Sequence, residues 1–108
     1  MSAPVPAPEA CRIDVWLWRA RFFKTRSLAA GFVEEGRVRL SRGGQETRLD
    51  KPSRTVRPGD GLVFALGGRL TAVRILACGE RRGPASEART LYAPLEQDAM
   101  KSEGASEA

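Results

Sequence analysis

The sequence predicts an α+β domain with two N-terminal helices, a small antiparallel sheet and a short C-terminal helix. Apolar residues recur at helical spacing in the first third of the chain, over residues 11–35. Short alternating or continuous apolar segments separated by glycines follow over residues 37–77, as is typical of strands. Pro84 and Ser86 then open a last helical segment, which is expected to reach Tyr92.

The first helix is predicted within the segment CRIDVWLWRARFF, residues 11–23. Its core face consists of apolar residues at positions i, i+3, i+4, i+7 and i+10, namely Ile13, Trp16, Leu17, Ala20 and Phe23. Trp18 and Phe22 fall on the opposite side of this helix. They either stack on nucleobases or pack beneath the C-terminal segment, and the sequence leaves both alternatives open.

The second helix is predicted over residues 26–35, with Leu28, Ala29 and Phe32 facing the core. The hydroxyl side chain at position 25 or 27 can cap its N-terminus. Gly36 follows the last turn as a C′ residue, where a left-handed backbone conformation commonly ends a helix.

The strands are predicted from shorter signals. Residues 37–40 alternate arginine with apolar residues, as in a half-buried strand, and residues 41–53 are expected to form a polar loop. Residues 54–56 form a short strand, and residues 61–66 form a buried strand. The dipeptide Gly67-Gly68 predicts a hairpin that joins this strand to residues 69–77.

The length of 108 residues predicts one domain, which we place at residues 11–93. Residues 1–10 are rich in proline and alanine and are expected to form a disordered arm. Residues 94–108 are expected to form a flexible acidic tail. No signal peptide and no membrane-spanning segment is recognisable, so we expect a cytoplasmic protein without a membrane partner.

The sequence offers little support for catalysis or metal binding. It contains no histidine, which removes the commonest general base and the commonest metal ligand. Cys11 and Cys78 are far apart in the sequence, so we expect reduced thiols, with Cys78 as a small buried side chain. We therefore expect no enzyme activity, no catalytic residue, no metal and no cofactor.

The predicted domain is strongly basic. Residues 11–93 contain 17 of the 18 Lys and Arg residues but only 8 of the 13 Asp and Glu residues, which gives a net charge of +9. Most of these cations are arginines, whose planar forks suit phosphate groups and stack on bases. A cluster of cations without a nucleophile and base pair favours binding of a nucleic-acid backbone over catalysis.

The start of the second helix has charges of the unfavourable sign. Lys24 and Arg26 lie where the helix dipole favours an acid, and the segment has no acid before Glu34. Free backbone N–H groups, hydroxyl groups and two cations together predict an anion site, with a phosphate as the counter-charge. Arg37 and Arg39 follow directly and are expected to extend this basic surface.

The segments RIDVWLWRARFFKTRSLAAGFVEEGRVRL and KPSRTVRPGD resemble the S-four RNA-binding domain, also called the alpha-L RNA-binding motif. The segments WLWRARFFKTRS and GERRGPASEARTLY resemble more closely a family of small bacterial ribosome-associated proteins, the fifteen-kilodalton heat-shock proteins. The resemblance covers residues 12–93. It implies two helices before a small antiparallel sheet, with RNA contacts from the second helix and the strand after it.

The resemblance implies RNA contacts at nine positions of this chain: Arg12, Lys24, Thr25, Arg26, Ser27, Arg37, Arg39, Lys51 and Arg54. It also implies a non-enzymatic role on structured RNA, namely rRNA and tRNA of the large ribosomal subunit, in ribosome rescue or recycling under heat stress. We expect a monomer. The alternatives are an RNA- or DNA-binding module that acts with a separate RNA-modifying enzyme, and a DNA-binding or general chaperone-like protein.

Overall fold

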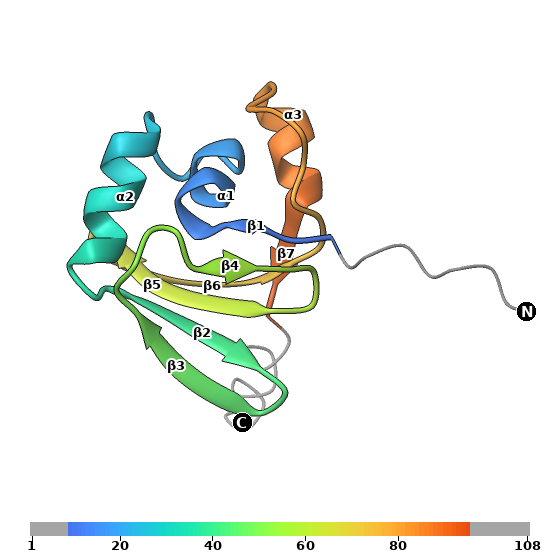
Figure 1. Ribbon diagram of the computed structural model, residues 1–108. Helices are drawn as coiled ribbons and strands as arrows, with labels where there is room; N and C mark the ends of the chain where they lie inside the picture. Colours follow the sequence, from blue (N-terminus) through green and yellow to red (C-terminus); the bar gives the residue numbers. More distant parts are fainter. Residues whose placement is uncertain (1–8, 96–108) are drawn as a thin grey trace, which may run out of the picture.

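The structure is a computed structural model that describes residues 9–95, and it confirms the α+β class (Figure 1). Helices α1 (Ile13–Arg19) and α2 (Arg26–Glu34) precede most of the strands, and α3 (Ala85–Ala88) follows them. All three helices lie on one side of the five-stranded sheet (Figure 1). None of the helices among residues 9–95 has the length and apolar character that crossing a membrane requires.

The main sheet is antiparallel throughout and has the strand order β3-β2-β5-β6-β7. Its strands are β2 (Val38–Arg42), β3 (Gln45–Leu49), β5 (Gly61–Leu66), β6 (Arg69–Ile75) and β7 (Tyr92–Pro94). A second, two-stranded sheet pairs β1 (Cys11–Arg12) with β4 (Thr55–Val56). The predicted strands at residues 54–56 and 61–66 and the hairpin at Gly67-Gly68 are confirmed.

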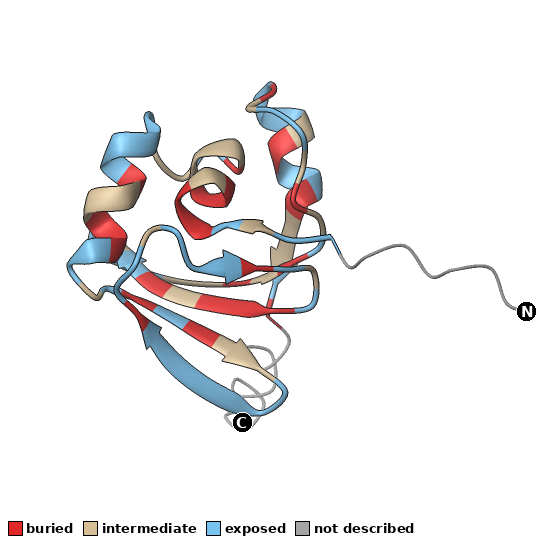
Figure 2. Ribbon diagram, viewed as in Figure 1, coloured by how far each residue is buried: buried red, intermediate tan, exposed pale blue. Residues whose placement is uncertain are grey.

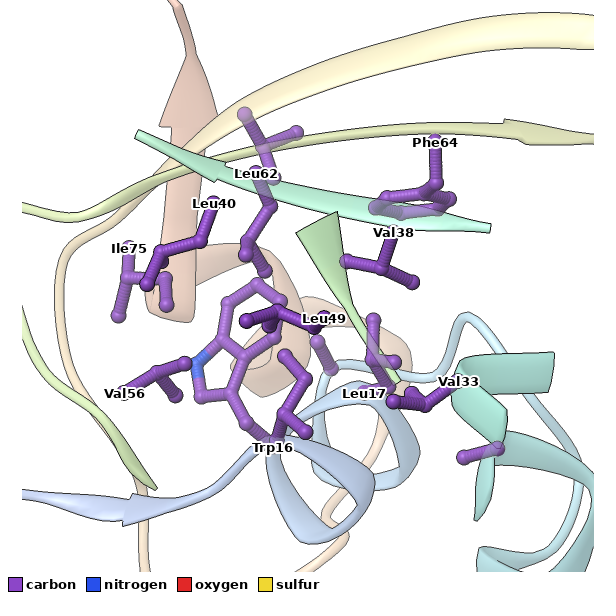
Figure 3. Packing of buried hydrophobic residues seen from close by; sticks show 14 of the residues in the cluster. Trp16, Leu17, Val33, Val38, Leu40, Leu49, Val56, Leu62, Phe64 and Ile75 are labelled. Carbon is purple, nitrogen blue, oxygen red and sulfur yellow. The ribbon is translucent and has the colours of Figure 1, made fainter. Parts of the chain in front are cut away.

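The core lies between the helices and the inner face of the main sheet (Figures 2 and 3). Trp16 and Leu17 of α1 meet Leu40, Leu62 and Ile75 of the sheet, and all five side chains are at most 2% exposed. Strand β2 contributes alternate residues to this core: Val38 and Leu40 are buried on its inner face, whereas Arg39 between them is exposed. The predicted core face of the first helix is therefore confirmed for its four residues up to Ala20.

The first helix is shorter than predicted. Cys11 and Arg12 are extended and pair with Val56 and Thr55, so α1 begins only at Ile13. It ends at Arg19, and Arg21 adopts a left-handed φ of 68° that reverses the chain. Phe22 therefore packs from a turn instead of from a helix face. Its ring lies 5.3 Å from Phe64 and 4.9 Å from Tyr92, which decides between its two alternatives in favour of packing.

The polar segment predicted as a loop at residues 41–53 is largely a hairpin. Strands β2 and β3 pair through the two-residue turn Gly43-Gly44, in which both glycines have positive φ, 58° and 82°. This conformation matches the turn that joins twisted antiparallel strands, and it favours glycine at both positions. The sequence of β3 lacks the alternation of apolar and polar residues that indicates a half-buried strand, because four of its five residues are exposed.

Two further expectations are wrong. The last helix does not reach Tyr92, because α3 gives way to a 3₁₀ turn, η1 (Arg89–Leu91), and Tyr92 starts β7. Leu28 does not face the core, since it is 56% exposed. Its spacing fits the core stripe of an isolated helix, but α2 buries the stripe formed by Ala29, Phe32 and Val33.

Contacts of the described residues extend slightly beyond the predicted domain range of residues 11–93. The backbone N–H of Cys78 donates to the carboxylate of Glu9, and Leu95 is buried and donates its N–H to the carbonyl of Ala72. Both Glu9 and Leu95 lie outside the predicted range of residues 11–93. The rest of the predicted arm and tail lies outside the described residues.

The expectation of free thiols is also wrong for this structure. Cys11 of β1 and Cys78 form a disulfide, with their Cα atoms 6.0 Å apart. Cys78 is buried as predicted. The pairing was not recognisable because strand β1, which brings Cys11 to this place, forms only through its contact with β4.

Candidate nucleic-acid interface

The N-terminus of α2 has the predicted features of an anion site. Thr25 is the N-cap, and its hydroxyl oxygen accepts a hydrogen bond from the backbone N–H of Leu28 at 3.0 Å. The first turn of α2 contains no acid. Lys24, Thr25, Arg26 and Ser27 are all exposed, so two hydroxyl groups and two cations surround the positive end of the helix dipole.

A buried carboxylate from α1 lies beside this helix start. Asp14 is 3% exposed, and its oxygens accept hydrogen bonds from the Arg12 guanidinium at 3.1 and 2.9 Å. These hydrogen bonds and the charge of Asp14 raise the pKa of Arg12 above its usual value. Arg26 reaches the same carboxylate at 3.8 Å. Asp14 is therefore a counter-charge for Arg26 within the protein.

Asp14 joins two of the predicted contact residues into one unit. A single carboxylate holds Arg12 from β1 and Arg26 from α2, although each arginine keeps about half of its side chain exposed, 50% in both cases. Their remaining N–H groups face solvent and can donate to a phosphate. The arrangement therefore orients two guanidinium groups without using up their donors.

The segment after β3 places two further predicted contact residues, Lys51 and Arg54, close to the start of α1. The carbonyls of Arg54 and Pro52 accept hydrogen bonds from the backbone N–H groups of Ile13 and Asp14, at 2.8 and 3.3 Å. The first two backbone N–H groups of α1 thus have hydrogen-bond acceptors within the protein. Lys51 and Arg54 are exposed next to this helix start, and no ion pair within residues 9–95 joins either side chain to Asp14.

The other predicted cations lie beyond the C-terminal end of α2. Gly36 ends the helix with the expected positive φ of 73°. The guanidinium of Arg37 lies 4.4 Å from the centre of the Phe32 ring and 3.1 Å from the Glu35 carboxylate. Arg39 projects from β2 and lies 3.6 Å from Glu46. The side chains of Arg37 and Arg39 are 50% and 59% exposed, respectively.

Arg48 is a further cation of this surface that is not among the nine predicted contact residues. It stands opposite Arg39 in the β2–β3 pairing, and cross-strand partners project from the same face of a sheet. The signal was available in the dipeptide Gly43-Gly44, which sets this register. Arg42, in contrast, is bound to the buried carboxylate of Asp60 at 2.9 and 2.8 Å, which raises the pKa of Arg42.

Three shallow hollows connect the two groups of cations. A hollow of about 330 Å³ is lined by Asp14, Arg26, Ser27 and Ala30. A second, of about 310 Å³, shares Ser27 and extends along α2 to Arg37. A third, of about 300 Å³, shares Arg37 and is lined by Gly36, Arg39, Arg48, Val63, Phe64, Ala65 and Leu70. Because neighbouring hollows share Ser27 and Arg37, we describe them, together with exposed Lys24 and Thr25, as one surface that we call the basic face. Its middle part along α2 is lined mainly by apolar residues.

Comparisons with known proteins show to which family this chain belongs. The family model described as "S4 domain" matches residues 11–62. Heat shock protein 15 of Escherichia coli K12 is 41% identical over 98 residues, which are 91% of this chain and 69% of that protein. The Heat shock protein 15 homolog of Haemophilus influenzae is 35% identical over 90% of this chain and 70% of its own length.

A solved structure gives the same answer for the fold. Heat Shock Protein 15 of Vibrio cholerae, described as trimeric, superposes with a TM-score of 0.72 at 38% identity. The match covers 88% of this chain and 91% of that chain. The resemblance found in the sequence is therefore confirmed, and with it RNA binding through an S4 domain and a role linked to heat shock. This chain belongs to the heat shock protein 15 family.

Proposed function

We propose that this protein binds structured RNA of the large ribosomal subunit, rRNA and tRNA, through its basic face during ribosome rescue or recycling under heat stress. It acts as a cytoplasmic monomer without catalysing a reaction. The observation that supports this most directly is the exposed start of α2, where Lys24, Thr25, Arg26 and Ser27 surround a helix terminus without an acid in its first turn. Such a terminus is suited to a phosphate group.

The shape of the basic face favours a folded RNA over a single strand. Its cations lie at both ends of α2 and on the outer face of the sheet, joined by the three hollows. Proteins that bind single strands usually add aromatic platforms on which bases stack. Among the described residues, the rings that line this face are those of Phe23, Phe32 and Phe64. Phe32 lies under Arg37, and Phe32 and Phe64 are at most 8% exposed, whereas Phe23 is half-buried.

Binding to RNA is expected to weaken steeply as salt rises. Each phosphate neutralised by Lys or Arg releases counterions, so the slope of log K against log salt is about −0.7 to −0.9 per phosphate contact. The predicted cations imply several such contacts. A titration of the large ribosomal subunit between low and physiological salt measures the slope. A flat response would contradict electrostatic binding through this face.

Reversing the charge of Lys24 is expected to separate function from stability. Lys24→Glu should weaken binding to the large subunit about tenfold to a hundredfold, because it removes a charge-assisted contact of about 1.5–3 kcal/mol. The melting temperature should not fall, because a carboxylate near a helix N-terminus stabilises the helix by about 0.3–1 kcal/mol. Arg26→Glu should weaken binding and also lower stability, because it places a second carboxylate close to buried Asp14.

Arg89→Glu is the matched control, because Arg89 is exposed in η1, on the opposite side of α1 from α2 (Figure 1). It makes the same change of charge and should reduce affinity far less. The panel also includes duplex DNA and unstructured RNA at the same salt concentration. Equal affinity for the large subunit, duplex DNA and unstructured RNA would show that the positive charge acts without a defined site. Equal losses of affinity in Lys24→Glu and Arg89→Glu would show the same.

A further inference from the structure

The end of α1 and the residues that follow it, 18–23, which we call the α1–α2 turn, are held by a loop from a distant part of the sequence. Arg82 donates from Nε to the carbonyl of Trp18 at 3.1 Å and from Nη2 to the carbonyl of Phe23 at 3.4 Å. In the opposite direction, Nε of Arg21 donates to the carbonyl of Gly83 at 2.7 Å. We call these three hydrogen bonds the arginine clamp.

The clamp supports a backbone conformation that is unfavourable on its own. Arg21 has a φ of 68°, and this left-handed conformation is unfavourable for a residue other than glycine because Cβ crowds the following carbonyl oxygen. The Arg21–Gly83 hydrogen bond ties this residue to the loop. The carbonyl of Trp18 lies in the last turn of α1, where a cation such as Arg82 also interacts favourably with the helix dipole.

The loop that carries Arg82 is itself rigidly placed. Arg81 donates to the Glu87 carboxylate at 2.7 Å, and these hydrogen bonds lower the pKa of Glu87. Gly83 is buried so closely that a Cβ atom there would lie 2.6 Å from the Glu87 side chain. The side chain of Arg19 adds a hydrogen bond to the carbonyl of Gly79 at 2.7 Å. The clamp therefore connects the turn to a well-ordered part of the protein.

The turn leads directly into the anion site. Phe23, whose carbonyl accepts from Arg82, immediately precedes Lys24 and the N-cap Thr25. We propose that Arg82 is a positioning residue for RNA binding, which fixes the α1–α2 turn so that Lys24 and the first turn of α2 meet one phosphate. This inference rests on the proposed function and adds to it a residue that does not itself contact RNA.

The test compares affinity for the large ribosomal subunit in Arg82→Lys and in the control Arg81→Lys. Lysine keeps the charge but lacks the planar fork that spans two carbonyls. Losing the hydrogen bonds to Trp18 and Phe23 should leave the turn less often in the conformation that binds, and should weaken binding about tenfold in Arg82→Lys. Arg81→Lys should bind like the wild type, because lysine keeps the charge that pairs with Glu87 and thereby the placement of the loop, and Arg81 donates to Glu87 and not to the turn.

A double-mutant cycle with Lys24→Gln provides the readout that a merely structural role would not change. If Arg82 acts through the turn, the loss caused by Lys24→Gln should shrink in the Arg82→Lys background. An unchanged loss would overturn the inference, and so would wild-type affinity of Arg82→Lys. Wild-type protein that binds no subunit would instead overturn the proposed function, and the inference with it.

Arg21→Gly serves as a second variant if Arg82→Lys does not fold. Glycine adopts the positive φ without strain, so the backbone conformation at position 21 stays accessible, but the hydrogen bond that ties the turn to the loop carrying Arg82 is lost. This variant should also weaken binding and reduce the effect of Lys24→Gln. Unchanged affinity in folded Arg21→Gly would overturn the inference.

Discussion

Trp16→Ala is expected to lower the free energy of unfolding by about 3–5 kcal/mol, through lost burial and the cavity left behind. Trp16 is fully buried, between the sheet and the rings of Phe22 and Tyr92, whose centres lie 6.0 and 6.2 Å away. Its indole Nε1 donates to the carbonyl of Ala77 at 2.9 Å. Truncation also leaves this carbonyl without its donor. Urea unfolding followed by far-ultraviolet circular dichroism measures the change.

Trp18→Ala is the matched control, because Trp18 lies on the same helix but is only half-buried. It should cost clearly less stability than Trp16→Ala. The same variant addresses the alternative that the sequence left open for this residue. Unchanged stability with a marked loss of RNA affinity would show that Trp18 stacks on bases. Equal losses of stability in the two variants would contradict the difference in burial.

Reduction of the Cys11–Cys78 disulfide is expected to lower the free energy of unfolding by about 4 kcal/mol. The chain-entropy model gives this value for a crosslink that spans 67 residues, because it restricts the unfolded chain. The comparison is between oxidised protein and protein held in a reductant, by thermal and urea unfolding. Since cytosolic thiols are kept reduced, the crosslink contributes only under oxidising conditions.

The double variant Cys11→Ser, Cys78→Ser is the control, because it cannot form the crosslink. It should unfold like the reduced protein and show no further change when a reductant is added. Identical unfolding of the oxidised and reduced wild type would contradict a stabilising crosslink. Strand β1 is the region whose amide protection should respond first, since it holds Cys11 against β4.

Elements with strong local signals were predictable from the sequence. The second helix follows from its N-cap at Thr25 and from the C′ glycine Gly36, and the structure uses both. The hairpin at Gly67-Gly68 follows from a buried apolar strand and a two-glycine turn. In each case the information lies within a few neighbouring residues, where local backbone preference and burial agree.

Elements that depend on distant partners were not predictable in the same way. Strand β3 has no apolar alternation, because most of its residues are exposed on an edge strand. The extended backbone of Cys11 and Arg12 depends on the pairing with β4. The end of the first helix depends on Arg21, a residue type that gives no warning of a left-handed conformation.

The candidate site shows the same division. The cluster Lys24–Ser27 could be found because its charges conflict with its own helix. The carboxylate of Asp14 could not be assigned to it, because the contact with Arg26 joins two different helices. The role of Arg82 was hidden for the same reason, since its partners Trp18 and Phe23 are 64 and 59 residues away. The contacts of the nine residues with RNA stay predictions.

The dependence of α1 on distant segments has a consequence for the order of folding. An isolated helix of seven residues is not stable in water, and this one begins on the carbonyls of Pro52 and Arg54. Its indole hydrogen bond to Ala77 spans 61 residues, and the clamp at Arg82 closes its other end. Folding must therefore bring distant segments together before the helix is held, which is slow compared with local folding. A growing copy of this chain presents no completed basic face until nearly all of its described residues have been synthesised.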